Sequence, residues 1–154
     1  MNQSENRGDV IVVVAAVIER SDRRLLIGQR RRRDTSPLKW EFPGGKVEQG
    51  ESDEVALARE LREELGAKLV RSVPIGRAVH KYAETAVLLE IRFFAAELAS
   101  NEIRATAFEQ TAWVLPRELS EYDFLAANRE LVANLATGRI KPGEILANRG
   151  DQCS

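Results

Sequence analysis

Residues 45–67 read GKVEQGESDEVALARELREELGA, and this stretch decides the fold. Ser52 is a preferred helix N-cap and is followed by two acidic residues, which suit the first turn of a helix. Gly66 suits the left-handed position that ends a helix. The stretch therefore predicts a helix between these two residues. Its apolar stripe consists of Leu57, Leu61 and Leu65.

The same helix carries three carboxylates on one side. At about 100° per residue, Glu60, Glu63 and Glu64 span about 100° of its circumference. Close carboxylates repel one another, and a hard divalent cation such as Mg²⁺ or Mn²⁺ removes that cost. Because Mg²⁺ usually completes its shell with water and substrate phosphate oxygens, this face indicates phosphoryl chemistry. The alternative for three such glutamates alone is a solvated helix face with Glu/Arg pairs.

The residues around the helix favour the metal interpretation. Gly44 and Gly45 let the backbone approach a ligand closely. Arg59 is adjacent to the acidic face, where it can hold Glu51 or a catalytic glutamate in place. The joint pattern outweighs the solvated-face alternative.

At these residues the chain resembles the Nudix hydrolase family. The family pattern is Gly, five residues, Glu, seven residues, then Arg-Glu-hydrophobic-x-Glu-Glu-x-Gly-hydrophobic, and every fixed position is matched. Ala67 is smaller than the aliphatic residue usual at its position. The resemblance implies an α/β protein with an α/β/α sandwich around a central mixed β-sheet. It also implies metal-dependent hydrolysis of a nucleoside diphosphate linked to another moiety.

The resemblance assigns roles to individual residues. Glu60, Glu63, Glu64 and the Gly44 carbonyl would bind Mg²⁺, with Mn²⁺ as a possible substitute. Arg59 would assist catalysis as a positioning group. The general base is left open between Glu60, Glu63 and an acid on a later loop.

The loop acid departs from the family pattern. MutT-like proteins commonly carry a Glu six residues before the Trp of the last strand, and this chain has Ala107 there. Glu109, four residues before Trp113, is the substitute that we predict as catalytic. A solvated loop charge is its alternative.

Outside this family pattern, which is called the Nudix box, a resemblance to the MutT-like branch of the family covers roughly residues 10–137. It implies that Arg30 contacts phosphate and that the stretch containing Glu41 and Phe42 borders the nucleoside pocket. Phe42 is either a packing partner for the base or a plain core aromatic. The adjacent basic run, residues 31–33, is expected to be a solvated face rather than an aid to triphosphate binding.

Asn128 lies on the apolar stripe of a predicted second helix. A buried amide needs partners for both its donor and its acceptor. It could cap local backbone, but residues 123–128 read DFLAAN and resemble the segment in which MutT proteins read 8-oxoguanine with an Asn amide. Both interpretations stay open, and we favour base reading.

The rest of the chain predicts a single domain over residues 9–147, between a flexible N-terminus (1–8) and a flexible C-terminal tail (148–154). Strands are expected at 9–19, 25–29, 40–42, 68–79, 85–98 and 111–115. The second helix is expected to run from an Asp123 cap to Gly138, followed by irregular chain. Strands on both sides of a central helix suggest a layered α/β architecture.

Composition restricts the partners and the location. The net charge of −1 gives no field that favours a nucleic-acid polymer. One cysteine, Cys153, allows no internal disulfide, and the longest apolar run is too short to span a membrane. We therefore expect a cytoplasmic protein, with no membrane partner, as a monomer or homodimer.

The expected activity is Mg²⁺-dependent hydrolysis of a nucleoside triphosphate to the monophosphate and pyrophosphate. The preferred substrate is 8-oxo-dGTP, so the expected role is sanitation of the nucleotide pool. The first alternative is the same chemistry on CTP or another pyrimidine triphosphate. The second is a non-catalytic Nudix domain that senses a nucleotide.

Overall fold

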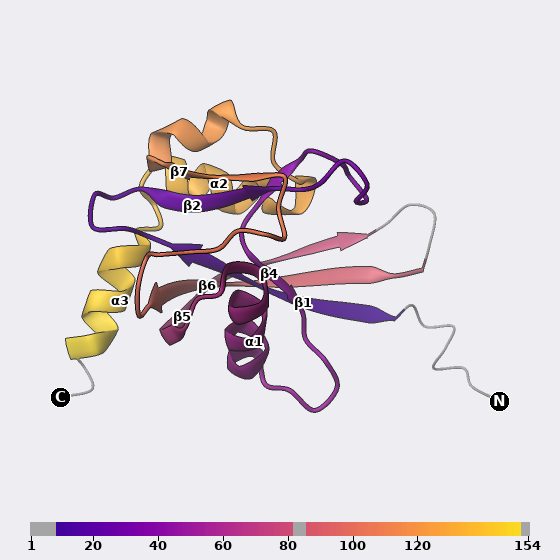
Figure 1. The fold of residues 1–154 in the computed structure, drawn as a ribbon, viewed down its shortest axis with the longest axis horizontal. Coiled ribbons are helices and arrows are strands. Elements are labelled where there is room, and N and C mark those ends of the chain that lie inside the picture. Colours follow the sequence, from indigo (N-terminus) through magenta and orange to yellow (C-terminus); the bar gives the residue numbers. More distant parts are fainter. Residues whose placement is uncertain (1–8, 82–85, 152–154) are drawn as a thin grey trace.

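The computed structural model describes residues 9–81 and 86–151, and a four-stranded mixed sheet lies at its centre (Figure 1). The order is β4-β1-β6-β5, with β1 and β6 parallel and the other pairs antiparallel. Its strands are β1 (Val10–Ile18), β4 (Gly44–Lys46), β5 (Leu69–Lys81) and β6 (Leu88–Leu98). A smaller antiparallel sheet, β3-β2-β7, comprises β2 (Leu25–Gln29), β3 (Trp40–Glu41) and β7 (Gln110–Val114). The predicted α/β class with a central mixed sheet is confirmed; Thr85, the predicted start of the strand expected at 85–98, lies outside the described residues.

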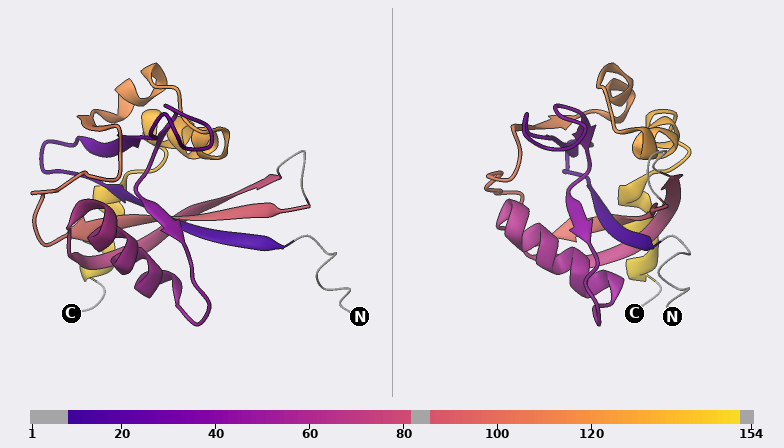
Figure 2. Two further views of the ribbon diagram at one scale, coloured as in Figure 1. Left: turned by 45° about the vertical axis from the view of Figure 1, so that its right-hand side comes forward. Right: turned by 90° about the vertical axis from the view of Figure 1, so that its right-hand side faces the viewer.

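The strand β1 is buried on both faces because its run of apolar residues meets a different layer on each side. Val14 and Ile18 pack with the leucines of α1 (Asp53–Leu65), whereas Ala15 and Val17 pack with α2 (Arg129–Ala136). A third helix, α3 (Pro142–Asp151), contacts β5 and β6. In the right-hand view of Figure 2, α1 and α3 lie on opposite sides of the sheet. This layering matches the predicted sandwich.

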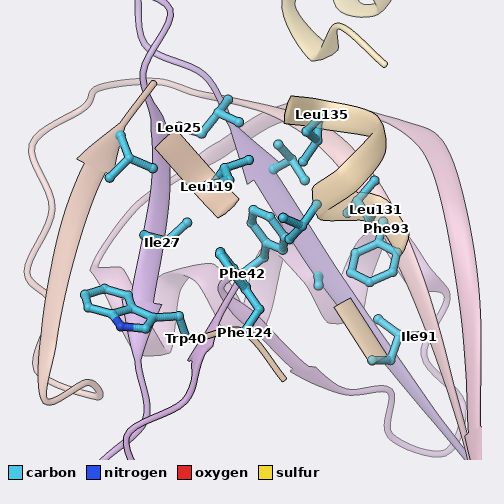
Figure 3. Close-up of a cluster of buried hydrophobic side chains, with 14 residues drawn as sticks. Leu25, Ile27, Trp40, Phe42, Ile91, Phe93, Leu119, Phe124, Leu131 and Leu135 are labelled. Carbon is cyan, nitrogen blue, oxygen red and sulfur yellow. The ribbon is translucent and has the colours of Figure 1, made fainter. Parts of the chain in front are cut away.

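The larger core cluster joins the two sheets to α2 (Figure 3). Phe42 lies at its centre, stacked on Phe124 at 5.4 Å between ring centroids and edge-on to Phe93 at 6.3 Å. Burial of each such side chain stabilises the fold by roughly 1.5–3 kcal/mol. The segment from β3 to β4 is therefore firmly anchored just before it reaches the acidic helix.

The ends of α1 are capped as the sequence predicts. The Ser52 hydroxyl accepts from the Val55 N–H at 3.2 Å, and Gly66 adopts a left-handed conformation with φ 63°. The N–H groups of Gly66 and Ala67 donate to the carbonyls of Arg62 and Leu61, which satisfies the last turn. Both boundaries of the acidic helix are thus set by local chemistry.

The prediction of one helix from Asp123 to Gly138 is wrong at its start. The Asp123 carbonyl accepts from the Trp40 N–H at 2.9 Å, and the Leu125 N–H donates to the Trp40 carbonyl at 3.0 Å. This pairing with β3 holds the chain extended, so α2 begins only at Arg129, after a 3₁₀ turn η3 (Ala126–Asn128). The Asp123 carboxylate pairs with the Lys39 ammonium instead of capping a helix.

The irregular chain predicted after Gly138 is also wrong, because it contains α3. The boundary placed at residue 147 falls inside this helix. Pro142 suits the first helical position, and Leu146 is buried against Val73 and Ala95 of the central sheet. Another 3₁₀ helix, η2 (Pro116–Glu121), follows β7. Across the described residues, none of the helices is long and apolar enough to cross a membrane.

Candidate active site

The acidic helix presents its three glutamates in three different environments. The side chain of Glu60 keeps 15% of its surface exposed and that of Glu63 keeps 59%. Glu64 lines a pocket and accepts a hydrogen bond from the Gly44 N–H at 2.9 Å. Since Leu57 and Leu61 on the other side are fully buried, the acidic side is fixed toward β4 and the pocket.

Gly44 and Gly45 allow the backbone of β4 to lie directly against these carboxylates. A Cβ atom at Gly45 would overlap the Glu60 carboxylate, and one at Gly44 would overlap the Val14 carbonyl oxygen. Larger residues would displace either the acidic helix or β1. The two glycines thus let this backbone pack closely against α1 and β1, and their predicted close approach to a ligand stays a prediction.

Arg59 is the hub of the ion pairs around the acidic helix. Its guanidinium binds Glu51 through two hydrogen bonds of 2.7 and 2.9 Å and donates to the Lys46 carbonyl at 3.0 Å. It also lies 2.9 Å from Glu60 and 3.4 Å from Glu63. Hydrogen bonds from Arg59 and from the backbone N–H of Glu48 lower the pKa of Glu51 to about 2. Arg59 thus holds Glu51 and two of the predicted metal ligands together.

Negative charge accumulates where the helix meets the pocket. Burial, together with the nearby carboxylates of Glu41, Glu60 and Glu63, raises the pKa of Glu64 to about 8, and the Gly44 N–H opposes this shift. Burial also raises the pKa of Glu41, against the effect of the Arg30 guanidinium. A group of carboxylates that resists full ionisation is a place where a cation would be stabilised.

The glutamates do not form a ready-made ligand set. Within residues 9–81 and 86–151, no three His, Cys, Asp or Glu side chains are grouped so as to hold a metal ion. The reason lies in their present partners: Arg59 stands between Glu60 and Glu63, and Glu64 is bound to Gly44. The donors are nevertheless all carboxylate oxygens, the chemistry that a hard cation requires.

A pocket of about 370 Å³ opens beside Glu64, in the last turn of α1. Its apolar lining comes from Ile11 and Val13 of β1, Leu89 and Ile91 of β6, and Leu125. Its polar lining includes Arg30, Glu41, Glu64 and Asn128. The structure therefore brings all four predicted substrate-binding residues, including Phe42, to one cavity adjacent to the acidic helix.

The sequence analysis missed the apolar lining of the pocket. Ile11 pairs with Leu89, and Val13 with Ile91, across the parallel β1–β6 ladder. These side chains come from strands far apart in the chain. Their alternate spacing within each strand was the only available signal, because the pairing that joins them is set by the fold.

Among the described residues, Asn128 is the only buried polar residue, with 3% of its surface exposed. Its side chain makes no capping hydrogen bond at the start of α2, and no other partner for its amide is found in the described chain. The capping alternative is therefore wrong. The amide lies on the pocket wall with its donor and acceptor both available.

Arg30 and Phe42 border the pocket but also have structural contacts. The Arg30 guanidinium donates to Glu41 at 3.1 Å and to the carbonyl and hydroxyl oxygens of Thr35 at 2.7 and 2.9 Å. Phe42 is buried in the core cluster while one part of it lines the pocket. Both positions are compatible with the predicted contacts of Arg30 with phosphate and of Phe42 with the base, which stay predictions.

The structure does not bring Glu109 to this pocket. Glu109 is exposed and lines a separate depression, together with Phe108 and the basic run at 31–33. Its backbone N–H extends the β2–β7 pairing by donating to the Gln29 carbonyl. Its predicted catalytic role has no geometric support in this conformation.

A family model described as the NUDIX domain matches residues 10–135 of the chain. The chain belongs to the Nudix family. It is accordingly a nucleotide pyrophosphohydrolase, an enzyme that hydrolyses phosphoric anhydrides, as the sequence predicts. Nudix hydrolases generally need a divalent metal ion.

Individual relatives place the chain among MutT-like Nudix proteins. A Mycobacterium tuberculosis protein named "Putative 8-oxo-dGTP diphosphatase 2" is 37% identical over 125 residues, which cover 81% of this chain and 87% of that protein. The Escherichia coli CTP pyrophosphohydrolase is 32% identical over 136 residues, covering 88% and 98%. A MutT structure from work on the Aliivibrio salmonicida and Vibrio cholerae proteins superposes with a TM-score of 0.69 at 29% identity, covering 84% and 99%.

Proposed function

We propose that this Nudix enzyme is an Mg²⁺-dependent 8-oxo-dGTP diphosphatase that releases 8-oxo-dGMP and pyrophosphate and thereby sanitises the cytoplasmic nucleotide pool. The observation that carries the proposal is the buried amide of Asn128, which has no protein partner among the described residues and lies on the pocket wall. Among the described residues, no fully enclosed side-chain nitrogen or oxygen lacks a hydrogen-bond partner, so the amide of Asn128 is open to the pocket and available to a ligand. The name of the Mycobacterium tuberculosis relative agrees with this substrate.

The amide of Asn128 matches 8-oxoguanine better than guanine. The exposed edge of guanine offers two acceptors, O6 and N7. Oxidation at C8 places a hydrogen on N7, so the same edge then offers an acceptor beside a donor. An Asn side chain has the complementary donor and acceptor side by side. It can satisfy both groups of the oxidised base but only one of the normal base.

The rest of the pocket suits a purine ring. The apolar side chains of Ile11, Leu89 and Ile91 give a flat lining from two neighbouring strands, and Phe42 contributes an aromatic edge. We assign Phe42 to packing against the base and Glu41 to the polar part of the same wall. Arg30, which holds Glu41, places positive charge beside the phosphate chain.

The acidic helix supplies the metal site of the proposal. Glu60, Glu63, Glu64 and the Gly44 carbonyl would hold Mg²⁺, since their all-oxygen donor set and their crowded negative charge fit a hard cation. When bound, the cation neutralises phosphate charge and lowers the pKa of water. Arg59 keeps Glu60 in place through their 2.9 Å contact.

The reaction consists of attack by water on a phosphorus of the triphosphate chain. A new P–O bond forms as the P–O bond of the bridge between the α- and β-phosphates breaks, and 8-oxo-dGMP and pyrophosphate are released. Glu60 or Glu63 accepts the proton of the attacking water, because both lie on the acidic helix whereas Glu109 lies in another depression. A general base of this kind contributes typically about 10²–10⁴-fold.

CTP is the second candidate substrate. The Escherichia coli relative, matched over 98% of its length, is named for CTP hydrolysis. Cytosine also presents a donor beside an acceptor on its pairing edge, so the Asn128 amide could satisfy it. The two candidates differ in ring size, and the larger purine ring system offers more surface to the apolar lining from β1 and β6.

The test is a panel of 8-oxo-dGTP, dGTP, CTP and dCTP, with kcat/KM measured in Mg²⁺ and again after chelation. We expect 8-oxo-dGTP to exceed dGTP by about 10–100-fold, the value of a good bidentate contact. Asn128→Ala should reduce that ratio toward one, whereas the control Asn148→Ala, at an exposed position on α3, should retain it. An equal loss on both substrates would refute base reading by Asn128.

Two other outcomes have definite meanings. A preference for CTP over 8-oxo-dGTP would replace the purine proposal with the pyrimidine alternative. Absence of turnover on every nucleotide with Mg²⁺ or Mn²⁺ would revive a sensing domain. The complete set of box carboxylates argues against that third possibility.

A further inference from the structure

The loop between β2 and β3 begins with four consecutive arginines, residues 30–33, and the proposed reaction uses only the first. Three N–H groups of Arg30 already donate to Glu41 and Thr35 within the protein. Most of its N–H groups already hold the loop in place beside the pocket. Arg30 therefore has few N–H groups left to donate to a phosphate chain.

Arg32 and Arg33 occupy the centre of a hydrogen-bonded turn. The Asp34 N–H donates to the Arg31 carbonyl at 3.1 Å, and the Asp34 carboxylate accepts from the Arg31 N–H at 2.9 Å. This is the pattern of a β-turn whose two middle residues project from the surface. The Arg31 side chain, in turn, donates to the Thr106 carbonyl and ties the turn to the opposite loop.

The two central arginines have no partner in the described part of the chain. Both are exposed, and neither takes part in a described ion pair or side-chain hydrogen bond. Asp34 is committed to the backbone of the turn. Glu109 lines the same depression of about 400 Å³ without pairing with either guanidinium.

The depression and the substrate pocket have no lining residue in common, but neighbouring residues of one loop line them. Arg30, Thr35 and Ser36 line the pocket, whereas the three arginines between them line the depression. Arg30 fixes both sections by bonding across the loop to Thr35. A chain of phosphates that leaves the pocket past Arg30 would reach the turn next.

We propose that Arg32 and Arg33 bind the distal phosphates of the substrate and make the enzyme select nucleoside triphosphates over diphosphates. This inference rests on the proposed triphosphate hydrolysis in the adjacent pocket, and it reverses the sequence-based expectation that residues 31–33 form only a solvated face. The planar guanidinium is suited to phosphate because it can donate two parallel hydrogen bonds. Two exposed contacts of this kind together change affinity by about tenfold.

The test compares the double variant Arg32→Gln/Arg33→Gln with the double variant Arg139→Gln/Arg149→Gln. The control pair removes the same charge from exposed positions on the far side of the molecule. KM and kcat are measured for the triphosphate and diphosphate of the preferred nucleoside. The inhibition constant of inorganic tripolyphosphate is measured in parallel. We expect KM for the triphosphate and the tripolyphosphate constant to rise about tenfold in the first variant alone, with kcat and the diphosphate KM unchanged.

Equal changes for triphosphate and diphosphate, or equal changes in both double variants, would overturn the inference. The choice of base does not enter, because the comparison uses whichever nucleoside the enzyme prefers. If the wild-type protein hydrolyses no nucleotide, the proposed function fails. Calorimetric binding of tripolyphosphate to the same variants then decides the role of the two arginines independently.

Discussion

The two ends of the active site differ in polarity: the acidic helix is highly charged, and the end that would bind the base is mostly apolar. At the acidic helix, the single guanidinium of Arg59 pairs with Glu51, Glu60 and Glu63, so ion pairs offset only part of the negative charge of a partly exposed surface. At the base end, apolar strands surround a single amide, Asn128, that has no partner in the described chain. The acidic helix thus supplies the charged groups for the reaction, whereas the base end supplies one polar side chain that can bind a particular base.

This difference predicts that reaction rate and base selectivity separate under mutation. A change at the acidic helix should lower turnover of every nucleotide by a similar factor. A change at Asn128 should alter the ratio between substrates. Four substitutions test this separation, in order of decreasing expected effect.

Glu64→Gln should have the largest effect. The amide retains the shape of the side chain and can still accept from the Gly44 N–H, but it cannot supply negative charge. We expect kcat/KM to fall about 10³-fold on all substrates, because charge stabilisation by a metal is worth several kcal/mol. Thermal stability should change little, since a carboxyl with its pKa at about 8 is largely protonated at neutral pH without the cation.

Glu54→Gln, an exposed position on the same helix, is the matched control and should retain full activity. Activity of Glu64→Gln within a factor of about three of wild type would remove Glu64 from the metal site. A loss confined to one base would contradict the separation of the two ends.

Gly45→Ala should have the next largest effect. The added methyl overlaps the Glu60 carboxylate, so the helix or the side chain has to move. Displacement by about 1 Å of a catalytic group lowers kcat by roughly 10²-fold. The control is Gly76→Ala, where open space surrounds the new Cβ. Steady-state kinetics and melting curves of both variants check this, and equal activity would show that Glu60 tolerates the shift.

Asn128→Leu should sharpen the contrast at the base end. It replaces an amide that is open to the pocket with an apolar group of similar size, so we expect the free energy of unfolding to change by less than about 1 kcal/mol. Selectivity for 8-oxo-dGTP over dGTP should fall while the stability is retained. Urea denaturation measures the first effect and the kinetic ratio the second. A less stable protein would indicate that the amide has a structural partner.

Glu51→Gln should give the smallest effect, visible as a dependence on pH. The folded pKa of about 2 lies below the ordinary value of 4.5, so ionised Glu51 contributes stability above pH 4.5. That contribution is lost as the pH falls through about 2. The melting temperature of wild type should therefore exceed that of the variant at neutral pH, and the gap should close under strong acid. A gap that is constant with pH would point to packing rather than charge.

The sequence predicted the acidic end of the site well because its signals are local. The Ser52 cap, the Gly66 terminus and the clustered glutamates lie within one short stretch, and each is decided by neighbours along the helix. The contact of Arg59 with Glu51 followed from the same short range. The strand β1 was similarly evident from its continuous apolar run.

The base end could be predicted only in part because it depends on distant pairings. Trp40 pairs with the chain near Phe124, which delays α2 and turns Asn128 from a mid-helix residue into the end of a 3₁₀ turn. The parallel pairing of β1 with β6 creates the apolar lining. Glu109 was selected by its spacing from Trp113, yet β7 places it beside the arginine turn.

The ion pairs of Arg59 imply that this enzyme can lose its metal ion and bind it again without unfolding. An internal guanidinium already serves Glu60 and Glu63 as a counterion, so the helix needs no external cation to fold. Prolonged dialysis against a chelator should yield an inactive but folded protein whose melting temperature is lower than that of the metal-bound form, because an ion that binds only the folded state stabilises it. Adding the ion back should restore activity without a refolding delay. In a cell, such a protein would outlast a period of magnesium scarcity and resume work as the supply returned.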